Sequence, residues 1–311
     1  MKPSVSIIIL NWNGLQDSLE CLDSLHHISY SNYRVVVVDN GSRGNEAGLL
    51  REKHGDYVHV IENGENHGFA EGNNIGMRYA LAEHDPDYIL LLNNDTVVEP
   101  DFLDALVDVA EGDPSVGMVG PKVCFHREPG KLQSAGGRVN WWTGEPKLIG
   151  WGEEDSSQFD GTEEVDWVLG CAFLIRRKTI ERIGLLNPTY FAFFEEVEWC
   201  IECRRAGFKV VCCRGARLLH KGGQDTQKVS GFRAYYVGRN RLLFMRRNAT
   251  KLQFACFLAQ FPVRHILVTS LWLLFRVRDR RSLARYYAGL WDGFRLITGA
   301  GREPRDDSRF E

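Results

Sequence analysis

The first strand expected in this 311-residue chain is not followed by either of the two common glycine-rich phosphate-binding loops. The β-prone apolar run Val5 to Leu10 leads into Asn11-Trp12-Asn13-Gly14. A dinucleotide-binding fingerprint or a P-loop would place several glycines at this turn. The sequence therefore argues against a standard dinucleotide-dependent dehydrogenase and against a P-loop NTPase.

A secretory leader and a disulfide framework are also missing from the pattern. Met1-Lys2-Pro3 passes directly into the first apolar run, with no apolar segment ending at a small-residue cleavage site. We therefore expect a cytoplasmic protein whose eight cysteines are reduced thiols. Cys200 and Cys203 fall in one predicted helix, and Cys212 and Cys213 point to opposite sides of a strand, which disfavours a zinc site.

The net charge of −3 is small, but it is unevenly distributed. From Phe232 onward there are sixteen Lys and Arg against six Asp and Glu, so residues 232–311 carry about +10 and residues 1–231 about −13. The sequence predicts an acidic domain at 1–231, whose charge is compatible with a bound metal cation. A basic, aromatic helical extension follows at 232–311.

The first hundred residues alternate between β-prone and helical patterns. Four apolar runs read as buried strands, and they are Val5–Leu10, Arg34–Asp39, Tyr57–Ile61 and Tyr88–Leu92. Helical patterns separate these runs, for example leucines 15, 19, 22 and 25 on one face. This rhythm predicts an α/β fold with a mainly parallel sheet.

Each predicted strand ends in polar residues, and open α/β sheets bind ligands beyond the carboxyl ends of their strands. Asn93-Asn94-Asp95 follows one buried strand. A carboxylate at this place can hold Mg²⁺ or Mn²⁺, with the phosphates of a bound ligand supplying further oxygen ligands. Asp39 follows another, where its carboxylate can accept a hydrogen bond from a pyrimidine N–H. Both segments also read as ordinary Asx or glycine turns.

Three further segments carry candidate chemistry. The glycine- and asparagine-rich segment 66–76 precedes a predicted helix, so its amides could approach phosphate, or it is a loop with a helix cap. The acidic run Glu195-Glu196-Val197-Glu198 follows apolar residues that would raise a carboxyl pKa toward that of a general base. The same acids also suit a helix N-terminus. His220 is either a metal ligand or a structural histidine.

These segments, taken in order, resemble family 2 glycosyltransferases with the GT-A fold, a Rossmann-like nucleotide-diphospho-sugar transferase fold. The resemblance is greatest to rhamnosyltransferase-like members that build bacterial surface polysaccharides, and it covers about residues 3 to 247. The segments that carry it are VVVVDNGS, ENHGFAEGNNIG, LLLNNDTVVEPDF, LGCAFLIRR, FFEEVEWCIECRRAGFKV and LLHKGG.

The resemblance implies a role for each matching position. Donor-binding residues would be Asn11, Asp39, Asn74, Asn93 and Asn94, with Asp39 at the base and Asn93 near the ribose. Metal ligands would be Asp95, at the family's DxD position, and His220. Acceptor-binding residues would be Gly170, Cys171 and Glu195.

Glu196 would be the catalytic base of a single inverting displacement. Two departures from the family pattern stand out. Asn93 replaces the first Asp of DxD, which leaves one fewer negative charge for the metal. Glu196 replaces the more usual Asp, which extends the base by one methylene group.

The implied reaction moves a sugar, with rhamnose as one candidate, from a dTDP- or UDP-linked donor to a glycan or lipid-linked acceptor. Nucleic acid is not among the expected partners. A sugar-1-phosphate nucleotidyltransferase would want a basic glycine-rich loop after the first strand. A noncatalytic nucleotide-sugar or glycan-binding partner of another transferase remains the alternative.

The extension contains a 22-residue apolar stretch, Phe254 to Phe275, long enough to span a bilayer. Arg264 near its middle would be costly inside a membrane, at about 2.5–3.5 kcal/mol. We therefore expect helices that lie on the inner face of the cell membrane or pack on the catalytic domain, with arginines near anionic headgroups. An ordinary helical subdomain or a homo-oligomer interface is the alternative.

Overall fold

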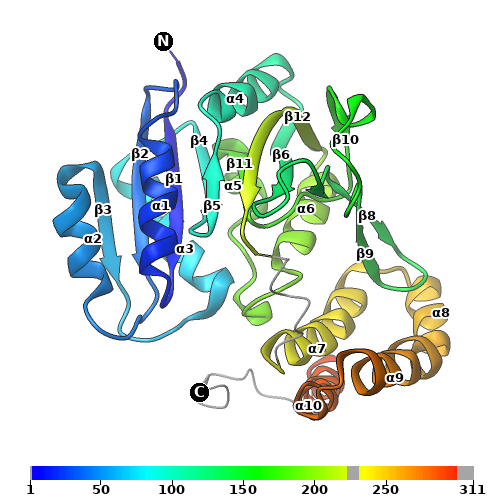
Figure 1. The fold of residues 1–311 in the computed structure, drawn as a ribbon. Coiled ribbons are helices and arrows are strands. Elements are labelled where there is room, and N and C mark those ends of the chain that lie inside the picture. The colour runs from blue at the N-terminus through cyan, green and yellow to red at the C-terminus, as the bar shows by residue number, and fades with distance from the viewer. Residues whose placement is uncertain (1, 223–230, 300–311) are drawn as a thin grey trace.

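A computed structural model describes residues 2–222 and 231–299 of the chain. A central twisted sheet is covered by helices on both faces, and a block of C-terminal helices lies against one end of it (Figure 1). The strands of the amino-terminal half are β1 (Val5–Asn11), β2 (Tyr33–Asp39), β3 (Val58–Glu62), β4 (Tyr88–Asn93) and β5 (Thr96–Val98). Its helices are α1 (Leu15–Leu25), α2 (Glu46–His54), α3 (Gly68–Glu83) and α4 (Phe102–Gly112).

The second half adds strands of both directions. These are β6 (Val116–Phe125), β7 (Leu132–Ser134), β8 (Gly137–Asn140), β9 (Glu145–Leu148), β10 (Thr162–Glu164), β11 (Ala172–Arg176) and β12 (Lys209–His220). The helices that follow are α5 (Arg177–Ile183), α6 (Glu195–Arg205), α7 (Gly231–Asn248), α8 (Lys251–Phe261), α9 (Thr269–Leu271) and α10 (Arg280–Ile297). Strands β8 and β9 form a separate hairpin.

The main sheet has the order β10-β12-β6-β11-β4-β1-β2-β3. Strands β3, β2, β1 and β4 are mutually parallel, as the βαβ rhythm predicts. β11 runs antiparallel to both of its neighbours, β4 and β6. The predicted α/β class is confirmed, but the parallel character belongs to the first half, and the second half is mixed because β11 inserts in the opposite direction.

The sheet is buried on both faces because its strands are almost continuously apolar. In β2 the four valines 35–38 are each at most 2 % exposed. Alternate residues feed two different cores, with Val36 and Val38 on one face and Val35 and Val37 on the other. This burial holds the carboxyl ends of β1, β2 and β4 in fixed register, with Asn11 directly beside Asp39.

The glycine- and asparagine-rich segment 66–76 lies mostly inside a helix rather than in a loop before one. Helix α3 begins at Gly68, about five residues earlier than the pattern suggests. A Cβ at Gly76 would come within 2.5 Å of Ile8 Cγ2, and one at Gly72 within 2.6 Å of Leu10 Cδ1. These glycines therefore let α3 pack closely on β1.

Helix α7 lies between α6 and α10 and contacts both, with by far the more extensive contact on α10. Among its buried residues are Ala234, Tyr235, Tyr236 and Arg239. The division after residue 231 stays a prediction.

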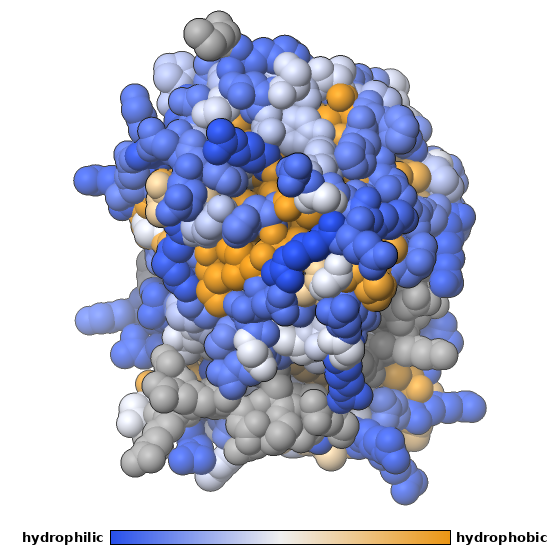
Figure 2. Space-filling model, turned by 90° about the vertical axis from the view of Figure 1, so that its left-hand side faces the viewer, coloured by the Kyte–Doolittle hydropathy of each residue, from blue (hydrophilic) through white to orange (hydrophobic). Residues whose placement is uncertain are grey.

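The side of the molecule formed by α2 and the edge strand β3 is mostly hydrophilic around a limited apolar patch (Figure 2). Leu49 is the exposed large hydrophobic residue of α2, with 43 % of its surface accessible. This modest patch contrasts with the C-terminal helices described below.

Candidate active site

Polar residues at the ends of β1, β2 and β4 form one hydrogen-bonded group. Asn11 Nδ2 donates to Asp39 Oδ1 at 2.7 Å, and Ser18 Oγ donates to Asn11 Oδ1 at 2.7 Å. Asn94 Nδ2 donates to Ser18 Oγ at 2.9 Å, which ties the end of β4 to the same group. Asn11 and Asp39 are both buried, so the network sets the side-chain positions before any ligand arrives.

Asp95 and His220 face each other across the gap between β4 and β12. His220 Nε2 lies 3.1 Å from Asp95 Oδ1, and His220 Nδ1 lies 2.7 Å from Gln133 Oε1. Burial lowers the pKa of His220, but Cys171 and Asp95 raise it, with a net value of about 10. Burial raises the pKa of Asp95, but the nearby His220 outweighs it and the pKa is lowered.

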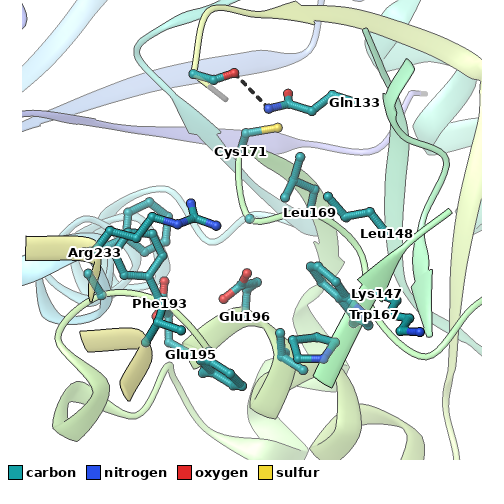
Figure 3. Close-up of a pocket in the computed structure, with 18 of the residues that line it drawn as sticks. Gln133, Lys147, Leu148, Trp167, Leu169, Cys171, Phe193, Glu195, Glu196 and Arg233 are labelled. Atoms are coloured by element: carbon teal, nitrogen blue, oxygen red, sulfur yellow. Dashed lines mark hydrogen bonds between the residues drawn. The ribbon is translucent and has the colours of Figure 1, made fainter. Parts of the chain in front are cut away.

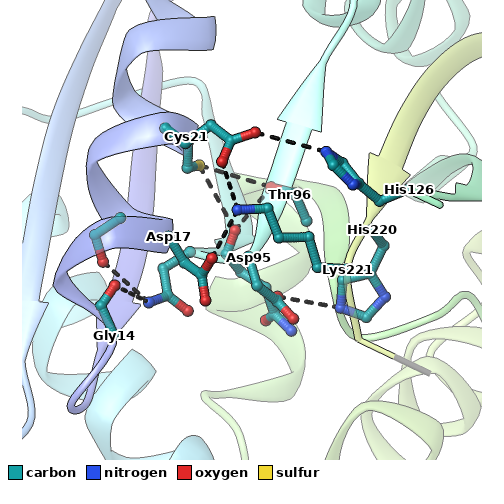
Figure 4. Close-up of polar contacts among 12 residues, drawn as sticks. Gly14, Asp17, Cys21, Asp95, Thr96, His126, His220 and Lys221 are labelled. Atoms are coloured by element: carbon teal, nitrogen blue, oxygen red, sulfur yellow. Dashed lines mark hydrogen bonds and ion pairs between the residues drawn. The ribbon is translucent and has the colours of Figure 1, made fainter. Parts of the chain in front are cut away.

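A lysine next to His220 fastens this region to α1. Lys221 Nζ donates to Asp17 Oδ1 and to Glu20 Oε2, each at 2.6 Å (Figure 4). Because Lys221 is only one residue beyond His220, this double ion pair holds the end of β12 beside the end of β4. The backbone N–H of Lys221 also donates to the Asp95 carbonyl at 2.9 Å.

A pocket of about 610 Å³ opens beside His220 and contains six of the predicted site residues. These are Asn93, Gly170, Cys171, Glu195, Glu196 and His220. Its other walls come from the β9 strand, from the segment around Trp167 and Leu169, and from α7 through Arg233, Val237 and Arg241 (Figure 3). The structure thus gathers residues that lie more than a hundred positions apart in the sequence.

Glu195 and Glu196 are the two acidic side chains at the floor of this pocket. Their Oε2 atoms are buried and make no hydrogen bond. Burial, opposed by backbone N–H groups and Arg233, raises the pKa of Glu196 to about 7. Burial and the neighbouring Glu196 raise the pKa of Glu195 well above its usual range. A carboxyl of this kind is suited to accept a proton near neutral pH.

The third acid of the run has a structural task. Glu198 is 1 % exposed, and its carboxylate accepts hydrogen bonds from Tyr190, Asn187, Arg247 and Asn248 at 2.8–2.9 Å. It therefore joins α6 to α7. Only the first two acids of the run face the pocket.

The turn before α6 aims these acids through an unusual backbone. Phe191, Phe193 and Phe194 all have positive φ, at 62°, 68° and 78°. Residues with side chains rarely adopt this conformation, and it persists only where surroundings enforce it. Asn240 of α7 supplies that enforcement, because its Nδ2 donates to the carbonyls of Tyr190, Ala192 and Phe193 at 2.9, 2.8 and 2.8 Å.

Gly170 lies directly above Glu196. A Cβ at this position would be 3.2 Å from Glu196 Cγ and 3.5 Å from its Cδ. The next residue, Cys171, accepts a hydrogen bond from Asn93 N at 2.8 Å through its carbonyl. Gly170 and Cys171 therefore lie between Glu196 and Asn93, and all four residues line the pocket.

Asn74 does not join this group. Its Nδ2 donates to the Leu186 carbonyl at 2.8 Å, and its Oδ1 accepts from Leu186 N at 3.0 Å. Both polar atoms are thus engaged by backbone, and the residue ties α3 to the segment after α5. The nucleotide contact expected at Asn74 stays a prediction.

Several residues at or beside the pocket had no recognisable pattern in the sequence. Gln133, Trp167 and Arg233 line the pocket, and Asn240 supports the turn before α6. Gln133 lies in a loop-rich stretch, and Arg233 and Asn240 lie in a helix that reads as part of the extension. Only the fold brings them to the site. The arginines of α7 were a partial signal for a role in the pocket, because an arginine in a helix can face a buried carboxylate instead of solvent.

Solved structures of other proteins share this architecture. The mannosyltransferase PcManGT from Pyrobaculum calidifontis, solved with GDP-Man and Mn²⁺, has a TM-score of 0.57 at 18 % identity and covers 97 % of this chain and 77 % of its own. Residues 1–349 of S. aureus TarS match with a TM-score of 0.57 at 13 % identity, over 96 % of this chain and 83 % of theirs. At these identities the likeness establishes the fold.

The fold, the family model and the curated relatives define a glycosyltransferase of the GT-A type. The chain belongs to glycosyl transferase family 2, whose family model matches residues 6–184. The fold and the family expected from the sequence motifs are confirmed.

Among curated proteins the chain is similar to transferases of surface glycans. The low-salt glycan biosynthesis hexosyltransferase Agl10 of Haloferax volcanii is 28 % identical, over 78 % of this chain and 76 % of its own length. The dTDP-rhamnosyl transferase RfbF of Shigella flexneri is 23 % identical over 97 % of this chain and 99 % of its own. The rhamnosyltransferase WbbL of Escherichia coli is 24 % identical over 78 % and 96 %. The chain is therefore rhamnosyltransferase-like within its family.

Proposed function

We propose that this chain is a metal-dependent inverting glycosyltransferase that moves a sugar, with rhamnose as first candidate, from a dTDP- or UDP-linked donor to an acceptor hydroxyl. The observation that supports the proposal most directly is the position of the Glu196 carboxyl group. Its buried, unpartnered Oε2 lines the same pocket as Asn93 and His220. A candidate base in one pocket with Asn93, the expected ribose contact, and His220, the expected metal ligand, is what a direct displacement needs.

In the proposed step, Glu196 takes the proton from the acceptor hydroxyl. The acceptor oxygen forms a bond to the anomeric carbon while the bond from that carbon to the diphosphate oxygen breaks, and the diphosphate leaves with the electron pair. Attack from the face opposite the leaving group inverts the configuration. Charge develops on the sugar ring much as in glycoside hydrolysis. Gly170 leaves room for the Glu196 side chain beside the acceptor.

Asp95 and His220 are the residues that would hold Mg²⁺ or Mn²⁺. Their facing Oδ1 and Nε2 atoms offer one oxygen and one nitrogen, a donor set that suits Mn²⁺ somewhat better than Mg²⁺. Gln133 orients the imidazole through its other nitrogen. Within residues 2–222 and 231–299 no cluster of three His, Cys, Asp or Glu side chains could hold a metal, so donor phosphates would complete the site. The ion would neutralise charge on the departing diphosphate.

The names of the relatives support the donor and the setting. RfbF is named a dTDP-rhamnosyl transferase and WbbL a rhamnosyltransferase, which makes dTDP-rhamnose the first donor to test. We propose a glycan or lipid-linked acceptor in cell-surface polysaccharide synthesis, met at the cytoplasmic face of the cell membrane. Asn11, Asp39 and Asn94 would contact the nucleotide, and Cys171 and Glu195 the acceptor.

The test is turnover of a panel of dTDP- and UDP-sugars with Mn²⁺, with Mg²⁺ and with EDTA. We expect transfer or slow donor hydrolysis with one donor, lost with EDTA and restored by the ion. Glu196→Gln is expected to bind that donor and lose transfer by about 10²–10⁴-fold. Donor binding without turnover in the unmodified protein would contradict the proposal and favour a noncatalytic partner of another transferase.

A further inference from the structure

The C-terminal helices present a large apolar surface to solvent. We call it the tail face, and it consists of the exposed side chains Leu252, Val263, Leu267, Val268, Leu271, Trp272, Leu274, Phe275, Tyr287 and Trp291. Phe275 is 72 % exposed, and Leu252 and Trp291 are each 66 % exposed. Large apolar groups gathered in this way are unusual on a free protein surface.

The tail face is one side of a continuous helical run from Lys251 to Val277. Val263, Leu267, Leu271 and Phe275 recur at every fourth residue and are exposed. Buried residues Phe257, Phe261 and His265 follow the same spacing on the other side. Tyr287 Oη lies 2.9 Å from Ser270 Oγ, so α10 extends the exposed surface beside this run.

The run is long and apolar enough to cross a membrane, yet its polar contacts hold it against the protein. Arg264 makes two hydrogen bonds to the Glu145 carboxylate, at 2.8 and 3.0 Å. His265 Nε2 lies 2.8 Å from the Thr143 carbonyl. Both partners lie at or beside the turn of the β8–β9 hairpin. A spanning orientation would break these contacts and bury the charge of Arg264, so an orientation parallel to a surface fits better.

The charges around the tail face are mostly positive. From Lys251 through Arg278 the chain has no acidic residue. Arg276, Arg278, Arg280 and Arg281 cluster where the run meets α10. Asp279, between them, is used as the helix cap of α10, accepting from Arg281 N and Ser282 N. An apolar face bordered by arginines complements the boundary between acyl chains and anionic headgroups.

We propose that the tail face inserts into one leaflet of an anionic lipid bilayer, with the helices lying in the plane of the membrane. Apolar side chains such as Leu267 and Phe275 enter the acyl region, Trp272 and Trp291 lie at the headgroup level, and the arginine cluster meets phosphate groups. The inference does not depend on the proposed reaction. It specifies which surface faces the membrane.

The docking surface is connected to the pocket through the β8–β9 hairpin. Arg264 and His265 form hydrogen bonds to the turn end of the hairpin, at Glu145 and Thr143. Residues Glu145 to Leu148 of the same hairpin line the pocket. In Figure 1 the hairpin descends onto α8 from the sheet. A protein docked by its tail face would hold this wall of the pocket near the headgroups, where a lipid-linked acceptor would be found.

The test is co-sedimentation of the full chain with vesicles of phosphatidylcholine alone and with vesicles that also contain phosphatidylglycerol. We expect preferential binding to the anionic vesicles. Leu267→Glu with Phe275→Glu should lower the partition coefficient at least about tenfold, since two inserted apolar groups become charged. Arg276→Glu with Arg281→Glu should lower binding to anionic vesicles about fivefold or more. Leu49→Glu, at an exposed apolar position of α2, is the matched control and should bind normally.

Thermal unfolding checks that each variant is folded, and transfer to a water-soluble acceptor is measured on the same preparations. Retained transfer with lost vesicle binding separates this inference from the proposed reaction. Equal sedimentation of the Leu267→Glu, Phe275→Glu variant and the unmodified chain would overturn the inference. So would an unmodified chain that fails to bind vesicles but is a dimer in sedimentation velocity and becomes monomeric in that variant, because a second copy would then cover the tail face.

Discussion

Asn240 of α7 donates a hydrogen bond to the carbonyl of Phe193, one of three phenylalanines with positive φ just before α6. The same amide also holds the carbonyls of Tyr190 and Ala192. A helix far along the chain thereby fixes the backbone from which Glu196 projects. The relationship makes Asn240 a positioning residue for the proposed base.

Asn240→Asp keeps the size of the side chain but replaces its N–H donors with an acceptor facing three carbonyls. We expect a destabilisation of about 1–3 kcal/mol and a fall in kcat larger than the change in KM, because the turn relaxes and Glu196 shifts. The pH profile of transfer should shift as well, which a purely structural role would not produce. Asn73→Asp, which loses one bond to the Phe69 carbonyl, is the control. An unchanged kcat and pH profile in folded Asn240→Asp would rule out positioning.

Gly170→Ala tests the close approach to Glu196. The new methyl group would lie 3.2 Å from Glu196 Cγ, so the carboxylate must move by a few tenths of an ångström. Small displacements of a catalytic group are costly, and we expect kcat to fall by about tenfold to a hundredfold with little change in thermal stability. Gly112→Ala, whose methyl group would meet nothing within 4 Å, is the control. Equal kcat values for the two variants would show that Gly170 does not constrain the base.

The raised pKa of Glu196, about 7, predicts how activity and stability vary with pH. Only the deprotonated carboxylate can accept a proton, so kcat/KM should rise with pH and level off above about pH 7. Glu196→Gln removes this limb together with most of the activity. A profile in the unmodified enzyme that is flat from pH 5 to pH 8 would contradict the assignment.

Stability should vary in the opposite direction. The folded protein holds the Glu196 proton more tightly than the unfolded chain does. The resulting stabilisation of the folded state is therefore complete below pH 4.5 and is lost as the pH rises through 7. The difference is at most about 3 kcal/mol for this group. Thermal unfolding at pH 5 and pH 8 should show a smaller loss in Glu196→Gln than in the unmodified chain.

Gln133→Ala tests the orientation of His220. Removing the partner of Nδ1 leaves the imidazole free to rotate, and losses of this kind weaken metal binding by about 10–100-fold. We expect a corresponding rise in the Mn²⁺ concentration that half-activates transfer, and a larger rise in Asp95→Asn. Gln158→Ala, at an exposed position, should respond like the unmodified protein. Unaltered Mn²⁺ activation in Asp95→Asn would remove Asp95 as a ligand.

The sequence predicted the parallel half of the fold well because its strands are short apolar runs with clear breaks. The valine run of β2 and the polar residue Asp39 after it are an example. The antiparallel insertion of β11 was not predictable, since Ala172–Arg176 reads the same in either direction. Strand direction is set by the path of the chain, which local pattern does not record.

Candidate site residues were predictable from the sequence where several polar residues lie together in one motif. They were not predictable where the fold brings a residue to the pocket from a distant segment. Glu196, Asp95 and His220 each lie in a recognisable motif. Arg233 and Asn240 lie in a helix that reads only as basic and aromatic, and nothing in its pattern shows that it faces the pocket. Asn74 also lies in a recognisable motif, but its sequence does not show that both ends of its amide bond to the Leu186 backbone.

The junction between α7 and α8 has a practical meaning for protein engineering. Asn248 still bonds to Glu198 and Arg205 of α6, whereas Thr250 opens a capping box with Gln253. Exchange of C-terminal segments between relatives at Ala249 would keep these contacts with α6, but it must also preserve the close packing of α7 on α10. A cut at residue 231 would instead remove the scaffold of the active site along with the helices it was meant to transplant.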